Sequence, residues 1–236
     1  CNTSTNKYYL SSEDSLKNSS IQKWLLSSFT VSNMIEAGHN MKDRIFFEAI
    51  PKGTEYISTV IESMQQNKVL LIDYQPFDQH NKTIHFCPYA MKIYNQRWYM
   101  VGLIQEQENV RTIAFDRIRE MDSTEERFTV PKTFSAKKLF ADRIGIFVDD
   151  QAAPHKVILR AHGPSVDYLR SLPLHSSQEE IRTKHEVYSD FQYKIYLTPE
   201  LETKILAMGE NIEVLEPKEL RDKIADRLQS AVNRYK

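Results

Sequence analysis

The 236-residue sequence predicts an α+β protein that begins with a helical segment, continues into a small five-stranded β-barrel and ends in an αβ domain. Three observations lead to this prediction. Apolar residues recur at helical spacing in the first third, short bulky runs separated by turn residues follow from Val69, and strand-like and helix-like runs alternate after residue 155. The predicted divisions are 1–66, a polar tether and helical linker or dimerisation segment; 67–130, the barrel; 131–154, a connector; and 155–236, the C-terminal domain.

The first third is predicted to be mainly helical. Residues 1–20 are polar and rich in serine, which is typical of a tether. Two apolar stripes at helical spacing follow, on either side of a break at Pro51-Lys52-Gly53. The stripes consist of Ile21, Trp24, Leu25 and Phe29, and of Tyr56, Ile57, Val60, Ile61 and Met64. We expect this segment to serve in packing or dimerisation.

Five extended runs are predicted next, at residues 69–74, 83–87, 89–94, 97–104 and 109–118. Their close spacing favours a small all-β barrel or sandwich. Because successive side chains of a strand face opposite ways, one parity is expected to form the core. That parity contains Ile84, Phe86, Met91, Ile93, Trp98, Met100, Val110, Thr112 and Ala114. The other parity is cationic and aromatic and contains His85, Cys87, Lys92, Tyr94, Arg97, Tyr99 and Arg111.

The C-terminal domain is predicted from the order of its elements. These are a strand at 156–160, a helix after Pro164, strands at 182–188 and 191–197 joined by a turn at Ser189-Asp190, a helix from Thr198-Pro199 to Gly209, a strand at 212–215 and a closing helix after Pro217. Thr198 supplies an N-cap hydroxyl, and Pro199 suits the first helical position. The order β-α-β-β-α-β matches the split βαβ, ferredoxin-like plan.

Composition and motifs exclude several functions. The net charge of -1 gives no general attraction to nucleic acid or anionic membrane, so a polyanion site must be local. The two cysteines, Cys1 and Cys87, suit a reducing cytoplasm, with a lipoprotein Cys1 as the alternative and Cys87 as a small buried apolar residue. No apolar run is long enough to cross a bilayer, and no catalytic or metal-binding motif occurs. We therefore expect a cytoplasmic protein that is not an enzyme and has no cofactor or metal.

The stretch Arg97-Trp98-Tyr99-Met100-Val101-Gly102 resembles the signature of the WYL domain, with Met100 where the family usually has leucine. Pro88 on the preceding strand resembles a second family feature, and Arg111 with the following Asp116-Arg117-Ile118 resembles a third. Residues 143–215 are similar to the WYL C-terminal extension, and Pro51-Lys52-Gly53 resembles the joint to an upstream winged helix-turn-helix. Leucine and methionine have similar volumes, so the substitution is compatible with a core position.

The resemblance implies an Sm-like or SH3-like barrel followed by a ferredoxin-like extension. It further implies the ligand-sensing region of a bacterial transcription regulator, whose effector is a nucleotide or short single-stranded nucleic acid. Promoter DNA would be bound only through an upstream domain that is not present. Because the chain starts on Cys rather than Met, we expect it to be a piece of a longer protein, and we expect a homodimer without a membrane partner.

Carried over residue by residue, the resemblance gives Tyr99, Arg111 and Arg117 as ligand-binding candidates, with His85, Lys92 and Arg97 as supporting cations. Guanidinium groups bind phosphate oxygens in pairs, and a tyrosine beside them can stack on a base. The alternative is that these are solvated strand residues paired with Asp73, Asp116 or Glu120. A ligand role is favoured for Arg111 and Arg117, both readings stay open for Lys92 and His85, and Arg97 is expected at the surface beside a core Trp98.

Two other functions remain open. The chain could be a dimerisation scaffold without a small ligand, or a direct nucleic-acid-binding accessory protein that modulates a partner and loses affinity steeply with salt. The segment His175-Ser176-Ser177-Gln178 is expected to be a turn with capping side chains, although a ligand or protomer contact is the alternative.

Overall fold

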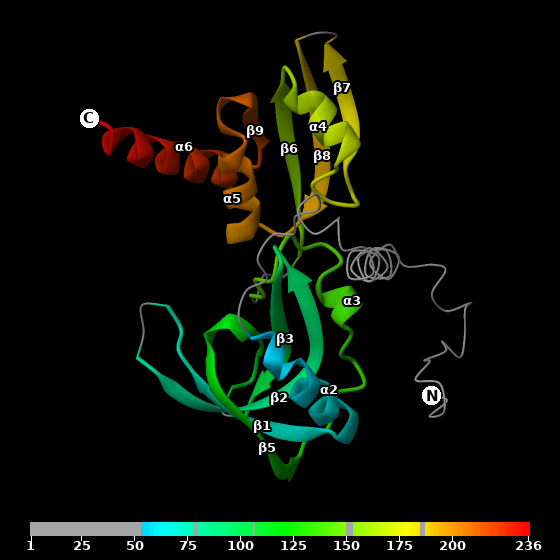
Figure 1. The fold of residues 1–236 in the computed structure, drawn as a ribbon. Coiled ribbons are helices and arrows are strands. Elements are labelled where there is room, and N and C mark those ends of the chain that lie inside the picture. The colour runs from blue at the N-terminus through cyan, green and yellow to red at the C-terminus, as the bar shows by residue number, and fades with distance from the viewer. Residues whose placement is uncertain (1–52, 78–79, 106, 150–152, 185–186) are drawn as a thin grey trace, which may run out of the picture. The chain divides into compact units, whose positions relative to one another are not determined.

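The computed structural model of the protein describes residues 53–77, 80–105, 107–149, 153–184 and 187–236. These residues form two antiparallel sheets, of five and four strands, with helices packed on them (Figure 1). The predicted α+β class is confirmed at this level. The predictions for residues 1–52, including the polar tether and the first helical stripe, lie outside the described residues. None of the helices in the described ranges is long and apolar enough to span a membrane.

The five-stranded sheet is an open one in the described part of the chain. It contains β1 (Lys68–Tyr74), β2 (Lys82–Tyr94), β3 (Arg97–Ile104), β4 (Val110–Ala114) and β5 (Ile118–Arg127). The strand order is β4-β3-β2-β1-β5 with antiparallel neighbours, so β4 and β5 are the two edges. The 3-10 helix η2 (Phe115–Arg117) joins these edge strands along the chain. The predicted run 109–118 is thus β4 plus η2, and the fifth strand is β5.

A β-bulge unites two of the predicted runs into the single strand β2. The register shifts between Pro88 and Ala90, and Pro88 lies opposite Gly102 of β3. Proline cannot donate a hydrogen bond to the ladder, which makes a bulge a suitable place for it. A Cβ atom at Gly102 would lie 2.0 Å from the carbonyl oxygen of Cys87, so the strands can approach this closely only at a glycine.

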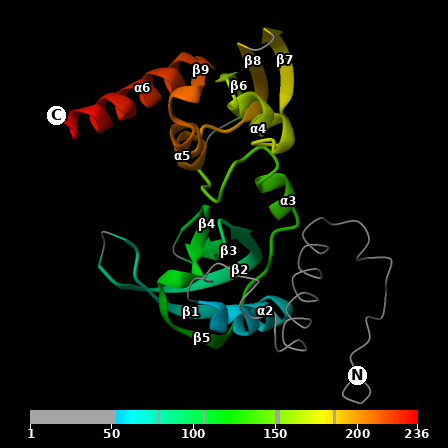
Figure 2. The same ribbon diagram turned by 45° about the horizontal axis from the view of Figure 1, so that its top comes forward.

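The core of this part lies between the sheet and α2 (Ile57–Gln66), which follows the 3-10 helix η1 (Thr54–Tyr56) and packs against β1, β2 and β5 (Figure 2). Val60 of α2 is fully buried with Phe86 and Met100, so the predicted core of β2 and β3 is confirmed in its centre. Trp98 is half-buried against the same cluster, whereas Ile93 is exposed.

The predicted parity of β4 is wrong. Ile113 lies opposite Met100 and is buried in the core, whereas Thr112 lies opposite Val101 on the other face. Arg111 therefore shares the face of Ile113 and Met100, not the face of Tyr99. The prediction placed the wrong side chains of β4 on the core face, because the connection between β3 and β4 does not preserve the alternation of side chains from one strand to the next.

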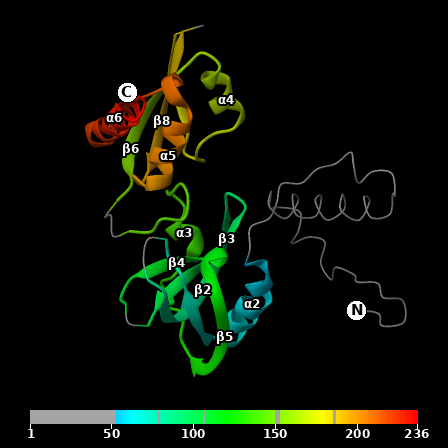
Figure 3. The same cartoon turned by 60° about the vertical axis from the view of Figure 1, so that its left-hand side comes forward.

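The C-terminal part has the predicted order of elements. These are β6 (His155–His162), α4 (Ser165–Ser171), β7 (Glu179–Lys184), β8 (Tyr188–Ile195), α5 (Pro199–Ala207), the 3-10 helix η3 (Gly209–Asn211), β9 (Ile212–Glu216) and α6 (Lys218–Asn233). The sheet order is β7-β8-β6-β9, with all neighbours antiparallel. Helix α5 lies beside β6 and β8 of this sheet (Figure 3). Its Leu201 and Ile205 are buried in one cluster with Leu159 and Phe191. A short helix, α3 (Ala136–Leu139), precedes this part in the connector.

The turn predicted at Ser189-Asp190 is wrong, because both residues lie within β8. The carboxylate of Asp190 is buried and accepts hydrogen bonds of 2.7 and 3.0 Å from Arg160 of β6. Arg160 also lies over the ring of Tyr188, 3.9 Å from its centroid. Because its charge is paired with that of Arg160, Asp190 can be buried inside a sheet, although a Ser-Asp sequence is typical of a turn.

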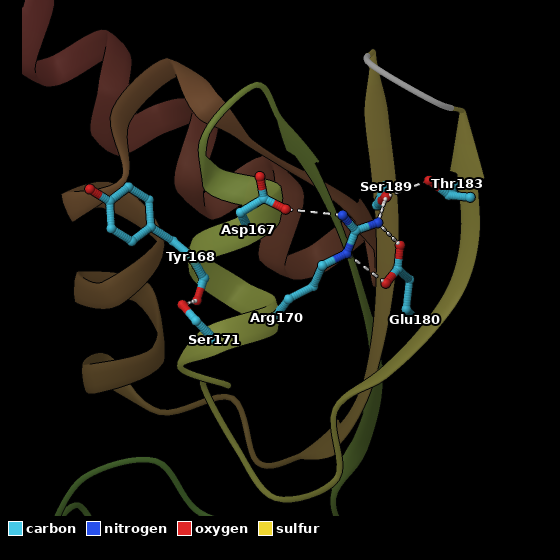
Figure 4. A network of polar contacts seen from close by, with 7 residues as sticks. All are labelled: Asp167, Tyr168, Arg170, Ser171, Glu180, Thr183 and Ser189. Atoms are coloured by element: carbon cyan, nitrogen blue, oxygen red, sulfur yellow. Dashed lines mark hydrogen bonds and ion pairs between the residues drawn. The ribbon is translucent and has the colours of Figure 1, made fainter.

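Polar contacts of Arg170 fasten α4 to the edge of this sheet (Figure 4). Its guanidinium donates hydrogen bonds of 3.0 and 2.7 Å to Glu180 of β7 and one of 3.1 Å to Asp167. The neighbouring segment 175–178 is a turn with capping side chains, as predicted. Gln178 accepts from the backbone N–H of Leu174 at 3.2 Å and from the Tyr193 hydroxyl at 2.9 Å.

Candidate ligand-binding site

A cavity of about 550 Å³ opens beside η2. It is lined by Gln75, Pro76, Phe77, His80, Asp116, Arg117, Ile118 and Arg119. These residues come from two stretches, one after β1 and one that runs from η2 into β5. The strands β1 and β5 are neighbours in the sheet. The backbone N–H of Gln75 donates to the carbonyl of Arg117 at 3.0 Å and closes the two stretches together. The volume suits a small ligand.

The 3-10 helix η2, which carries Arg117, packs closely against Gly53. Gly53 has a φ of 102°, and a Cβ atom there would lie 2.6 Å from the carbonyl carbon of Phe115. Phe115 is itself almost completely buried. The break predicted at Gly53 therefore allows the chain to pack directly against the backbone of η2, the element that carries Asp116 and Arg117.

Arg117 has an unused hydrogen-bond donor at this cavity. Its guanidinium lies over the Phe77 ring, 3.8 Å from the centroid, and its Nε is buried without a hydrogen-bond partner within the described ranges. The Oδ1 atom of the adjacent Asp116 is also buried, and it too has no hydrogen-bond partner in the described part of the chain. Buried polar atoms are nearly always hydrogen-bonded in folded proteins, to protein, water or ligand. Two neighbouring residues that line the cavity therefore each have one unpaired buried polar atom, an acceptor on Asp116 and a donor on Arg117.

Two further candidates, Arg97 and Tyr99, join this group. Arg97 lies 3.5 Å from the second oxygen of Asp116 and forms a hydrogen bond with Tyr99. Burial raises the pKa of Tyr99 above its ordinary value, and the positive charge of Arg97 opposes that change. Arg97 balances the charge of Asp116, which leaves Arg117 and Arg119 as the cations of the cavity.

Lys92 lies directly opposite Tyr99 in the β2–β3 ladder, but it does not line the cavity. Its Nζ donates to the carbonyl of Gly145 at 2.6 Å and lies 3.7 Å from the centroid of the Phe140 ring. Burial lowers the pKa of Lys92 to about 8, and the charge of Glu200 acts in the opposite direction. Lys92 is therefore a partly buried cation whose ammonium group contacts the connector at Phe140 and Gly145.

The two remaining candidates lie apart from the cavity. Arg111 is opposite Gly102 and donates from Nε to the side chain of Gln107 at 3.2 Å. His85 lies in the other half of β2, opposite Leu71 of β1. The structure thus gathers Arg97, Tyr99 and Arg117, places Lys92 behind Tyr99, and leaves Arg111 and His85 outside the group.

Sequence reasoning missed the other wall of the cavity, which consists of Gln75, Phe77 and His80, and it missed Arg119. The available signal was Phe77, a large aromatic residue between the extended runs predicted at 69–74 and 83–87. In the structure this side chain is 61% exposed, which is unusual for phenylalanine. Among the residues with assigned positions, no group of His, Cys, Asp and Glu is arranged to hold a metal ion.

Comparison with family models identifies the two parts of the chain. Residues 55–123 match the WYL domain, and residues 153–232 match the WCX domain. The chain therefore contains a WYL domain followed by a WCX domain, and the resemblance of Arg97–Gly102 and its flanking motifs to the WYL domain is confirmed. Among curated proteins, none matches this sequence.

Solved structures give more distant similarities. One is proteasome accessory factor B/C (PafBC) of Arthrobacter aurescens, with 17% identity and a TM-score of 0.37 over 80% of this chain and 30% of that one. Another is the crystal structure of a CRISPR Cas-related protein, with 12% identity and a TM-score of 0.46 over 77% of this chain and 52% of that one. The chain spans about a third of the first protein and half of the second.

Proposed function

We propose that this chain is the ligand-sensing region of a bacterial transcription regulator, not an enzyme, and that its effector is a nucleotide or short single-stranded nucleic acid. The effector binds in the cavity beside η2. The observation that carries the proposal is the buried, unpartnered Nε of Arg117 beside the Phe77 ring. The match of the two parts of the chain to the WYL and WCX domains supports it.

The chemistry of the cavity suits a ligand with both phosphate and base. Arg117 and Arg119 offer guanidinium groups to phosphate oxygens. Phe77 offers an aromatic surface for stacking, and the free Oδ1 of Asp116 can accept a hydrogen bond from an amino group of a base. A plain inorganic anion would leave that acceptor unpaired and the ring unused.

The finer fold assignment belongs to the same proposal. We assign the five-stranded part to the Sm-like class and the four-stranded part to the ferredoxin-like class. The meander of β1 to β4 with β5 returning beside β1 supports the first assignment. The position of β8 between β6 and β7, with α4 connecting those two strands, supports the second. A cytoplasmic location agrees with a regulator that acts on promoter DNA through an attached domain.

Isothermal titration of the intact protein with ATP and with a short single-stranded DNA tests the proposal. We expect saturable binding that Arg117→Ala weakens by roughly 10- to 100-fold, since charged hydrogen bonds contribute about 1.5–3 kcal/mol. Arg234→Ala removes the same charge from an exposed position and should leave the affinity unchanged. The proposal is contradicted if neither probe binds, or if the wild type and Arg117→Ala bind a probe with equal affinity.

A dimerisation scaffold is the second candidate, and one feature favours it. The first half of α6 is buried through Leu220 and Ile224, whereas Leu228 and Val232, which continue the same stripe, are 43% and 49% exposed. Light scattering decides this point. A dimer that Leu228→Glu converts to a monomer, together with no ligand binding, would favour the scaffold; a monomeric wild type would exclude it.

A further inference from the structure

Lys92 contacts the stretch of chain that precedes the C-terminal domain and is hydrogen-bonded to it. The residues concerned are 141–147, here called the connector segment. Lys92 binds the carbonyl of Gly145 at 2.6 Å, and Phe140, immediately before the segment, lies under its ammonium group at 3.7 Å. A lysine with a hydrogen-bonded and ring-stacked ammonium group has lost most of its conformational freedom.

The connector segment is tied to the C-terminal domain by several hydrogen bonds. The carboxylate of Glu200 in α5 accepts from the backbone N–H groups of Ile146 and Phe147, both at 3.0 Å. Thr198 donates to the carbonyl of Ile144 at 3.0 Å. At Gly145 the φ is +89°, and a Cβ atom would lie 2.4 Å from the side chain of Glu200. The segment therefore follows any movement of the N-terminus of α5.

On its other side Lys92 is adjacent to the proposed site. It lies opposite Tyr99, whose side chain is hydrogen-bonded to Arg97. Arg97 in turn pairs with Asp116 at 3.5 Å, and Asp116 lines the cavity. A ligand that donates to the free oxygen of Asp116 withdraws charge from this carboxylate and so weakens its attraction for Arg97 at the other oxygen. The next side chains affected by a shift of Arg97 are Tyr99 and then Lys92.

We propose that Lys92 couples occupancy of the cavity to the C-terminal domain, by holding the connector segment only while Arg97 and Tyr99 keep their unliganded arrangement. The coupling rests on the proposed function for its ligand, whereas the contact itself does not. A ligand transmits information only if it favours one of two arrangements. Here the two arrangements are Lys92 bound to Gly145 and Lys92 released.

Hydrogen exchange without any ligand tests the contact first. Loss of a charged hydrogen bond should speed exchange of the Ile146 and Phe147 amides by roughly tenfold in Lys92→Met relative to the wild type. Lys137→Met, which removes the same charge from an exposed site on α3, is the matched control and should exchange as the wild type does. If Lys92→Met does not fold, Phe140→Leu loosens the same contact from the other partner. Unchanged exchange in the folded variant overturns the proposal, whatever the ligand experiments show.

The second arm repeats the measurement with saturating ATP or short single-stranded DNA, whichever binds. In the wild type, binding should speed exchange of the connector segment. In Lys92→Met the probe should bind up to about tenfold more tightly, because binding no longer has to break the contact, and exchange should not rise further, since the contact is already lost. A ligand-induced change of equal size in both proteins, or none in the wild type, overturns the coupling. If neither probe binds, the proposed function fails while the first arm still decides the contact.

Discussion

The guanidinium of Arg117 lies over the ring of Phe77, 3.8 Å from its centroid. The two residues come from different connections of the sheet, one after β1 and one between β4 and β5. They meet because β1 and β5 are neighbours, with Tyr74 opposite Ile118. The pairing places a guanidinium group, which can bind phosphate, beside an exposed aromatic surface, as the proposed nucleotide site requires.

Removal of the Phe77 ring should weaken nucleotide binding. Stacking of a base on an aromatic side chain contributes about 1–3 kcal/mol, so Phe77→Ala should reduce affinity for ATP or short single-stranded DNA by roughly 5- to 150-fold in calorimetry. Tyr168→Ala removes an aromatic side chain that is 71% exposed and does not line the cavity, and it should have no effect. Equal losses in both variants would mean that the ring contributes nothing specific.

Salt should weaken binding only modestly. Two arginines, Arg117 and Arg119, line the cavity. For single strands the logarithm of the affinity falls with the logarithm of salt concentration by about 0.7 per phosphate contact, which predicts a slope near -1.4. Titrations with a short single-stranded DNA at several salt concentrations measure it. A much steeper slope would favour the accessory protein that binds nucleic acid along an extended surface.

Loss of the Thr198 hydroxyl should destabilise the C-terminal domain. The hydroxyl is fully buried, accepts from the backbone N–H of Leu201 at 3.2 Å and donates to Ile144 at 3.0 Å. Thr198→Ala removes an N-cap and leaves a buried carbonyl unpaired, so the free energy of unfolding should fall by about 1–3 kcal/mol in urea titrations. Thr203→Ala, on the exposed side of the same helix, should change little. Equal effects of the two substitutions would contradict the capping role.

The charge of Lys92 should make stability depend on pH. Burial lowers its pKa from the ordinary 10.5 to about 8 in the folded protein. Between these values the unfolded chain binds more protons than the folded one, so the contribution of Lys92 to the free energy of unfolding rises with pH from about 8 to about 10.5. Below pH 8 both states are protonated and this contribution is constant.

Comparison with Lys92→Met isolates this contribution from that of the other lysines. The free energy of unfolding of the wild type, minus that of Lys92→Met, should increase across this interval. Parallel pH profiles for the wild type and Lys92→Met would show that Lys92 titrates normally.

Alternation along the strands predicted the centre of the core correctly, because the pleat fixes which side chains of one strand share a face. Phe86 and Met100 are both fully buried. It did not predict the phase of β4 relative to β3, because that phase depends on the connection between them. Ile113, not Thr112, lies on the core face, and Arg111, two residues earlier, lies on the same face as Ile113.

The site was predictable only in part, for a similar reason. The family motifs contain Arg97, Tyr99 and Arg117, and these residues do come together. Phe77 and His80 belong to a connection with no periodic pattern, and their position opposite η2 depends on the pairing of β1 with β5. Strand order is a long-range property that hydrophobic patterning within one strand does not encode.

The most direct test of the central claim is the NMR signal of the Arg117 Nε–H group, assigned by its loss in Arg117→Lys. Titration with ATP or a short single-stranded DNA should shift this signal, because the unpartnered donor gains an acceptor. The Nε–H signal of Arg160, already bonded to Asp190 at 2.7 Å, should stay in place as an internal control. An Arg117 signal that does not move when the protein is saturated with ligand would contradict the account.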